Sequence, residues 1–233
     1  MIIPAYNAGK TIEWCLHFIF EQSYQNFEVI VVNDGSNDST REKLEKAKRA
    51  LGDRIRILHQ QNRGAPAARN RGAKEAKGEY LIFCDADIVM QEDCLKKMVH
   101  ALEEHTDASY AYSSFKFGWK KFKLWPFDAA RLRRMPYIHT TSLIRAEHFP
   151  KTGWDESVKR LQDWDLWLTM LEHGHTGVWI PAVLFTVVNT KGTMSRWMPA
   201  FCYKIPKWLG IRLASVTRYN EAVARIKQKH GLS

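Results

Sequence analysis

Residues 80–87 read Tyr-Leu-Ile-Phe-Cys-Asp-Ala-Asp, an apolar run that ends in two acidic residues. The run predicts a buried β-strand. In open α/β sheets, ligands bind at the carboxyl ends of such strands. If extended geometry continues, Asp85 and Asp87 point to the same side, because strand side chains alternate with a period of two. Two converging carboxylates suit a hard divalent cation, so this stretch predicts a Mn²⁺ or Mg²⁺ site at a sheet edge.

The residues before this stretch alternate between strand and helix patterns. Residues 27–33 and 55–58 are typical of buried strands. Residues 11–22, 39–52 and 66–78 are typical of helices, with capping and stop signals at their ends. This alternation predicts an α/β fold with a mostly parallel central sheet flanked by helices. The apolar run of residues 1–3 is very short for a first strand, which suggests that residues are missing before Met1.

The net charge of +10 belongs entirely to the second half of the chain. Residues 1–110 contain 15 Lys and Arg against 17 Asp and Glu, whereas residues 111–233 contain 20 against 8, a net of +12. Such a field favours an anionic partner, which could be nucleic acid, an anionic membrane face or a phosphate-bearing lipid. Charge alone does not choose among them.

Composition excludes some classes of protein. With 45% apolar residues, the chain can bury a sizeable core. Its apolar runs fall short of the roughly 20 residues that cross a bilayer, so no transmembrane helix is expected. The N-terminus lacks a signal-peptide pattern, which favours a cytoplasmic location. The four cysteines show no paired or metal-binding spacing and are expected to be free, buried thiols.

Four segments occur in an order that resembles glycosyltransferase family 2. They are IIPAYNAGKTI (2–12), VIVVNDGSNDST (29–40), NRGAPAARNRGAKEAKGEYLIFCDAD (62–87) and LQDWDLWLTMLEHG (161–174). Four ordered matches are far more specific than an isolated Asp-x-Asp. The resemblance covers roughly residues 1–188. It implies a Rossmann-like GT-A fold, a nucleotide-sugar donor, a divalent metal and transfer with inversion of configuration.

The resemblance also implies a donor site, in which a UDP-sugar is the favoured donor. Its residues would be Pro4, Ala5, Tyr6, Asn7, Asp34, Arg69, Asp85 and Ala86, with Asp85 and Asp87 as metal ligands. Tyr6 would stack near the nucleobase and Asp34 would accept a hydrogen bond from it. Both roles suit the residue types, since an aromatic face holds a planar base and a carboxylate reads an imide N–H. Arg69 would lie near the nucleotide.

An inverting transfer needs a base across the sugar from the leaving group. The resemblance points to Asp163 as this base and leaves Asp165 as a helix cap or support, because residues two apart on a helix do not face each other. Gln162 and Trp164 are expected at the acceptor. Lys191, in a loop where many relatives carry His or Arg, is expected at the acceptor or as a counter-charge to the diphosphate.

These assignments divide the chain into three parts. Residues 1–107 would form a nucleotide-sugar-binding βαβ half, residues 108–190 the acceptor-binding and catalytic half of the same domain, and residues 191–233 a basic helical extension. The acceptor would be a hydroxyl of a glycan or lipid-linked molecule in cell-envelope assembly. Basic aromatic segments of the second half would support peripheral contact with the inner membrane face.

Two alternatives stay open at this point. The first is a nucleic-acid-binding module that uses the basic, aromatic second half. It leaves Asp-x-Asp and the helix that opens with Gln-Asp-Trp-Asp (162–165) unexplained, so the main interpretation expects no nucleic acid. The second is a catalytically silent relative, which the short first strand and the absence of the late histidine favour.

Overall fold

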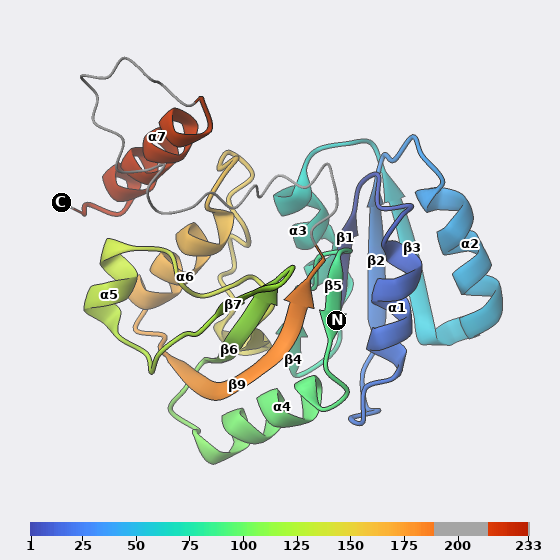
Figure 1. Ribbon diagram of the computed structural model, residues 1–233, viewed down its shortest axis with the longest axis horizontal. Coiled ribbons are helices and arrows are strands. Elements are labelled where there is room, and N and C mark those ends of the chain that lie inside the picture. The colour runs from blue at the N-terminus through green and yellow to red at the C-terminus, as the bar shows by residue number, and fades with distance from the viewer. Residues whose placement is uncertain (189–213, 233) are drawn as a thin grey trace.

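The protein, seen in a computed structural model, is described over residues 1–188 and 214–232 (Figure 1). Its N-terminal part is a parallel sheet in the order β1-β2-β3. The strands are β1 (Ile2–Ala5), β2 (Val29–Asp34) and β3 (Ile55–Gln60). Every residue of β1 and β2 is buried, as expected for parallel strands covered on both faces.

Helices cover the two faces of this sheet. They are α1 (Ile12–Phe20), α2 (Thr40–Leu51) and α3 (Ala65–Glu75). Side chains alternate across β2, so Val31 packs in one cluster with residues of α1 and α2, whereas Val32 packs with α3 on the other face. The sheet thus lies between two helical layers.

A second sheet continues the first at its β1 edge. Its strand order is β4-β8-β6-β9-β5, with β7 paired to β6. The strands are β4 (Tyr80–Ile82), β5 (Ile88–Met90), β6 (Tyr110–Phe117), β7 (Lys120–Phe122), β8 (Leu143–Arg145) and β9 (Gly177–Val187). A parallel bridge between Ile2 and Phe83 joins the two sheets. The pairs of this sheet are antiparallel, apart from the parallel pair of β6 and β9.

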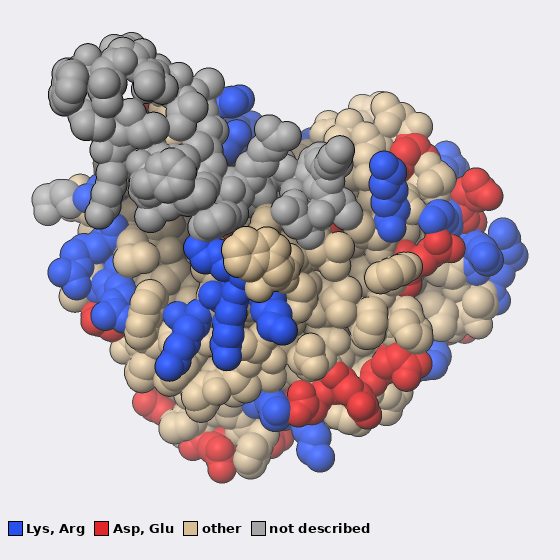
Figure 2. Space-filling model, in the orientation of Figure 1, with Lys and Arg blue, Asp and Glu red and all other residues tan. Residues whose placement is uncertain are grey.

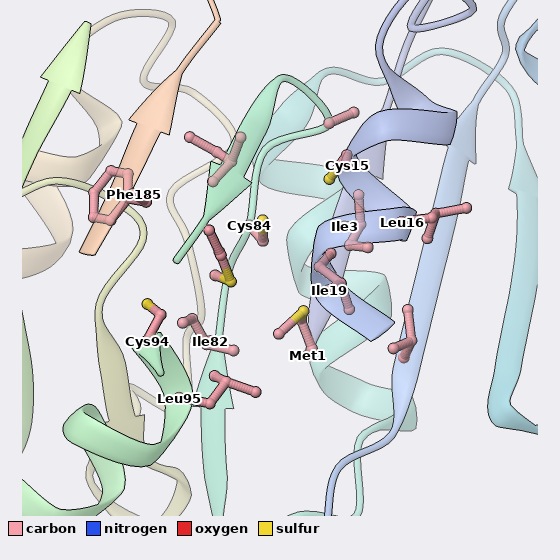
Figure 3. Close-up of a cluster of buried hydrophobic side chains, with 14 of the residues drawn as sticks. Met1, Ile3, Cys15, Leu16, Ile19, Ile82, Cys84, Cys94, Leu95 and Phe185 are labelled. Atoms are coloured by element: carbon pink, nitrogen blue, oxygen red, sulfur yellow. The ribbon is translucent and has the colours of Figure 1, made fainter. Parts of the chain in front are cut away.

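The remaining helices cover the second sheet and the end of the chain. They are α4 (Cys94–Glu104), α5 (Ala129–Arg134), α6 (Gln162–Glu172) and α7 (Ala214–Lys229), with short 3₁₀ turns at Gly52–Arg54 and Ala146–His148. Figure 3 shows the apolar cluster that α1 and α4 form with the sheet. A second cluster packs α6 against the other face, and buried Ile226 of α7 joins it.

The close approach of α3 to the sheet depends on Gly72. A Cβ atom at this position would collide with the side chain of Ile2 and crowd Val32. A glycine here therefore lets the backbone of α3 lie directly against β1 and β2, which fixes the height of the helix above the sheet edge.

The predicted α/β class, with a parallel sheet flanked by helices, is confirmed. After the Asp-x-Asp segment, β5 and a short turn come before α4, which begins at Cys94. Cys15, Cys84 and Cys94 are free and buried as predicted, whereas Cys202 lies outside the described residues. Among residues 1–188 and 214–232, no helix is long and apolar enough to span a bilayer.

Candidate active site

Arg69 of α3 joins three parts of the chain at the carboxyl edge of the sheet. The residue is only 5% exposed. Its Nη2 donates to Asp85 Oδ1 at 2.7 Å, and its Nη1 donates to Gln162 Oε1 at 2.9 Å. The guanidinium also lies over the ring of Trp154, 4.6 Å from its centroid. One side chain thereby ties the Asp-x-Asp segment to the start of α6.

The two carboxylates after β4 differ in their proton affinity. Burial raises the pKa of Asp85, but the charge and hydrogen bond of Arg69 outweigh it, so this pKa lies below its ordinary value. Burial, followed by repulsion from Asp85, raises the pKa of Asp87 to about 7. A neighbouring pair that resists double ionisation is a donor set that fits a divalent cation, which would remove the repulsion.

The protein supplies only part of such a coordination shell. Within residues 1–188 and 214–232, no group of three or more His, Cys, Asp or Glu side chains is arranged to hold a metal ion. Asp85 and Asp87 would therefore need further oxygen ligands from a bound molecule, as is common for Mg²⁺ bound with phosphates.

Asp163 lies in the first turn of α6, next to a strained residue. Leu161, just before the helix, has φ 58° and ψ 36°, a left-handed conformation that costs a side-chain-bearing residue about 1–2 kcal/mol. Burial raises the pKa of Asp163 despite the hydrogen bond from the Trp164 amide and the charge of Arg69. Arg69, which binds both Asp85 and Gln162, brings the start of α6 and the Asp-x-Asp segment together.

The loops after β1 and β2 are tied together beside these carboxylates. The Asn7 amide donates to Ser36 Oγ at 3.0 Å, and the Asn37 amide donates to Asn7 Oδ1 at 3.0 Å. Asn7 itself has φ 49°. Pro4 and Ala5 end β1 and are buried, whereas Tyr6 is 53% exposed and offers an open aromatic face.

Asp34 is buried and makes several hydrogen bonds within the protein, which the sequence does not predict. It is 2% exposed, and its carboxylate accepts hydrogen bonds from Gln60 Nε2 at 2.7 Å, the Arg63 amide at 2.9 Å and the Gly64 amide at 2.8 Å. These contacts order the loop that leads into α3. A carboxylate has about four acceptor positions, so these three bonds leave about one unused.

The prediction that Trp164 contacts an acceptor is wrong. Its side chain is fully buried, and its indole N–H donates to the Leu132 carbonyl at 2.6 Å. Successive helix residues differ by about 100° in direction, so the neighbour of Asp163 points into the core. Gln162 accepts a hydrogen bond from Arg69 and so lies beside the Asp-x-Asp segment. Ala86, which separates Asp85 from Asp87 in the sequence, is 8% exposed. Lys191 lies outside the described residues.

His139 is a residue of the site that no sequence motif indicates. Burial lowers its pKa to about 4, although the charge of Asp85 acts in the opposite direction, so the ring is neutral at pH 7. Its Nδ1 accepts from the Thr141 amide at 3.0 Å, and its ring packs against Phe115 and Phe185. Only the tertiary fold brings this loop residue close to Asp85.

Two residues at the end of α7, Lys229 and His230, contact acidic side chains of α6. Lys229 Nζ lies 2.8 Å from Asp155 Oδ2 and 2.7 Å from Asp165 Oδ1. His230 Nε2 lies 2.9 Å from Asp165 Oδ1, and its Nδ1 lies 2.6 Å from Glu172 Oε1. Asp165 is 3% exposed, so of its two predicted roles the structure gives it that of support.

Comparison with known proteins places the chain in a family. Residues 1–159 match the family model of Glycosyl transferase family 2. The protein therefore belongs to glycosyl transferase family 2.

Relatives and solved structures agree with this placement. The glycosyltransferase GlyG of Streptococcus pneumoniae is 38% identical over 105 residues, 45% of this chain and 35% of GlyG. The putative teichuronic acid biosynthesis glycosyltransferase TuaG of Bacillus subtilis is 27% identical over 220 residues, 86% of this chain and 83% of TuaG. The chain thus spans about a third of GlyG but most of TuaG.

Two solved structures share the fold. S. aureus TarS in complex with UDP-GlcNAc superposes with a TM-score of 0.72 at 19% identity, over 98% of this chain and 71% of that chain. The mannosyltransferase PcManGT of Pyrobaculum calidifontis, in complex with GDP-Man and Mn²⁺, gives 0.67 at 23% identity, over 82% of this chain and 57% of that one. The GT-A fold expected from the sequence is confirmed.

Replacing Arg69 with Ala is expected to lower the free energy of unfolding by about 1.5–3 kcal/mol, because its charged hydrogen bond to Asp85 and its bond to Gln162 are both lost. Arg69→Lys should recover only part of this loss, since an ammonium cannot bind Asp85 and Gln162 side by side. Urea denaturation measures both. Arg41→Ala, on the exposed face of α2, is the control and should stay within about 0.5 kcal/mol of the unchanged protein.

The His230 contacts predict a pH-dependent stability. Burial alone lowers the pKa of His230, but hydrogen bonds with Asp165 and Glu172 outweigh it, so its pKa in the folded protein is raised. Its stabilising effect is then complete below the unfolded pKa of about 6.5 and is lost as pH rises through the folded value. His230→Gln should therefore cost about 1–2 kcal/mol at pH 6. Urea denaturation at pH 6 and pH 8.5 should show the smaller loss at pH 8.5, and an equal loss at both values would contradict this account.

Proposed function

We propose that this protein is an inverting glycosyltransferase that uses a nucleotide-sugar donor, with Asp163 as its general base. The supporting observation is the bridge that Arg69 makes from Asp85 to Gln162, because it holds a carboxylate pair and the start of α6 in one site. Membership of glycosyl transferase family 2 supports sugar transfer as the reaction.

The donor is a nucleotide diphosphate sugar. The fold shared with structures that hold UDP-GlcNAc or GDP-Man supports this class of donor, and a UDP-sugar is our first choice. The nucleobase lies against the exposed ring of Tyr6, beside the tied loops after β1 and β2, with Pro4, Ala5 and Asn7 holding the first loop in place. Stacking on an aromatic face suits any planar base, while the remaining acceptor position of Asp34 favours a base with an N–H at its edge.

Asp85 and Asp87 are the residues that would hold a divalent cation, Mn²⁺ or Mg²⁺. The Mn²⁺ in the PcManGT structure supports this assignment. A cation held there would neutralise the negative charge that grows on the diphosphate as its bond to the sugar breaks. Arg69, whose charge is fixed beside Asp85, adds a positive group to the same side of the site.

Asp163 performs the proton transfer. Burial raises the pKa of Asp163, which makes its carboxylate a better base than an exposed aspartate. It takes the proton of the acceptor hydroxyl, whose oxygen forms a bond to the anomeric carbon as the bond to the diphosphate breaks on the opposite face. The new linkage therefore has the inverted configuration.

The acceptor is a hydroxyl of a glycan or of a lipid-linked sugar. The match to TuaG over most of its length supports a role in cell-envelope glycan assembly. Gln162, held by Arg69 next to Asp163, is the acceptor contact that the described residues offer. The active site would then work at the cytoplasmic face of the membrane.

A screen of UDP- and GDP-sugars tests the donor. In the presence of Mn²⁺, the correct donor at 100 times its dissociation constant should stabilise the fold by about 2.7 kcal/mol, visible as a rise in melting temperature. Asp87→Asn should abolish the Mn²⁺-dependent part of the rise. Asp93→Asn, which alters an exposed carboxylate of the turn before α4, is the control. A rise that is equal with and without Mn²⁺ would contradict the metal site.

Asp163→Asn separates catalysis from donor binding. The amide keeps the size of the carboxylate and still accepts from the Trp164 amide, but it cannot take a proton. Turnover of the donor should therefore fall by about 10²–10⁴ while donor affinity stays unchanged. Nucleotide release measures the first and thermal stabilisation the second. The control is Asp107→Asn, which alters an exposed residue before β6 and should change neither turnover nor donor affinity. If the unchanged protein bound the donor without any turnover, it would be a catalytically silent relative.

A further inference from the structure

The hairpin of β6 and β7 projects a large aromatic side chain into solvent. Its strands are joined by Gly118, with φ 55°, and Trp119. Trp119 is 90% exposed. A tryptophan this exposed adds nothing to the stability of the fold, since burial is what makes its large apolar surface favourable. Its position suggests contact with a partner.

The two faces of the hairpin have opposite character. Phe115 lies opposite Phe122, and their rings stack with centroids 5.0 Å apart, while Phe115 also stacks on Phe185 of β9 at 5.4 Å. The next pair along the strands is Lys116 opposite Lys121, which must point to the other face. Like charges directly opposite each other destabilise a sheet, so this pair is costly unless an anion lies beside it.

The surroundings of the hairpin are basic. Residues 108–127 contain four lysines and no Asp or Glu. Within the described ranges, no ion pair joins Lys116, Lys121 or Lys123 to a carboxylate. Figure 2 shows Lys and Arg side chains gathered over this part of the molecule, whereas acidic side chains gather mainly elsewhere on the same face.

After the hairpin, the chain leads through Trp125 into α5, which adds further exposed cations. The guanidinium of Arg131 lies over the ring of Trp125, 4.4 Å from its centroid, and Trp125 is 40% exposed. Arg133, Arg134 and Met135 follow and are exposed. The surface therefore mixes exposed aromatic and apolar groups with cations, the composition of segments that lie at a membrane interface.

This surface also borders the candidate active site. The Gly118 amide donates to the Val187 carbonyl at 2.9 Å, and the Val188 amide donates to the Asp87 carbonyl at 2.8 Å. A single strand, β9, thus separates the tip of the hairpin from the carboxylate pair (Figure 1). Anything that binds the tip lies at the edge of the sheet where Asp87 lies.

We propose that the β6–β7 hairpin docks on an anionic lipid surface. Trp119 enters the headgroup region, where its amphipathic ring is favoured, and Lys116 and Lys121 contact headgroup phosphates. A tip that bears one fully exposed tryptophan favours a bilayer over single-stranded nucleic acid, which binds in grooves lined by several stacking side chains. Docking brings lipid-linked molecules to the edge of the candidate active site; only this last step rests on the proposed glycosyltransferase function.

Co-sedimentation of the whole chain with vesicles tests the proposal. Vesicles of phosphatidylcholine with phosphatidylglycerol should bind the protein, and binding should weaken with added salt because headgroup charges are screened. Vesicles of phosphatidylcholine alone should bind it far less. Trp119→Ala and the double variant Lys116→Ala/Lys121→Ala should each weaken binding by about tenfold or more, since each removes one of the two attractive contributions.

Matched controls come from the other end of the molecule. Trp14→Ala removes a 66% exposed tryptophan of α1, and Lys46→Ala/Arg49→Ala removes two exposed cations of α2. Both should bind vesicles as the unchanged protein does. The proposal would be overturned if the hairpin variants bound vesicles as well as the unchanged protein does, or if the control variants lost as much binding as the hairpin variants. It would also be overturned if a single-stranded oligonucleotide displaced the protein from vesicles in a way that depends on Trp119.

The vesicle experiment contains no donor, so its result does not depend on sugar transfer. The hairpin variants should also keep the donor-induced rise in melting temperature, because Trp119 lies outside the donor site. Loss of vesicle binding together with an unchanged donor response would therefore locate the defect in membrane docking alone and support the proposal.

Discussion

The ion pair of Arg69 and Asp85 is the constraint on which the rest of the site depends. A guanidinium that is 5% exposed has lost most of its hydration, and that cost is offset only where the charge finds close partners. Arg69 has two hydrogen-bonding partners on different segments and an aromatic ring beneath it. Because these partners come from the strand end, the 150–160 loop and α6, satisfying one buried charge fixes the relative position of all three.

Packing on both sides keeps this bridge in place. Gly72 lets α3 sit directly on β1 and β2, so Arg69 reaches the sheet edge at a defined height. On the far side, Lys229 and His230 hold Asp165 and thereby the first turns of α6. The two aspartates of that helix start then have separate roles: Asp165 is tied into the protein, whereas Asp163, two residues earlier, stays partly accessible within the site.

Local sequence patterns were sufficient for the parts of the protein that local physics decides. The β-branched run of β2 and the glycine that ends α2 predicted those elements well, since both depend on neighbouring residues. The Asp-x-Asp segment was placed at the sheet edge for the same reason. The prediction for Trp164 fails because a sequence motif does not say where a side chain points. That direction depends on which face of α6 packs against the core. His139 has no local signal at all.

The sequence by itself determined the family, the α/β class and the two carboxylate segments, because these follow from residue order and periodicity. The tertiary structure decided which groups meet. The bridge from Asp85 to Gln162, the support of Asp165 by the end of the chain and the place of the β6–β7 hairpin next to Asp87 join residues far apart in sequence. Contacts of this kind depend on how all the elements pack together, which no local pattern specifies.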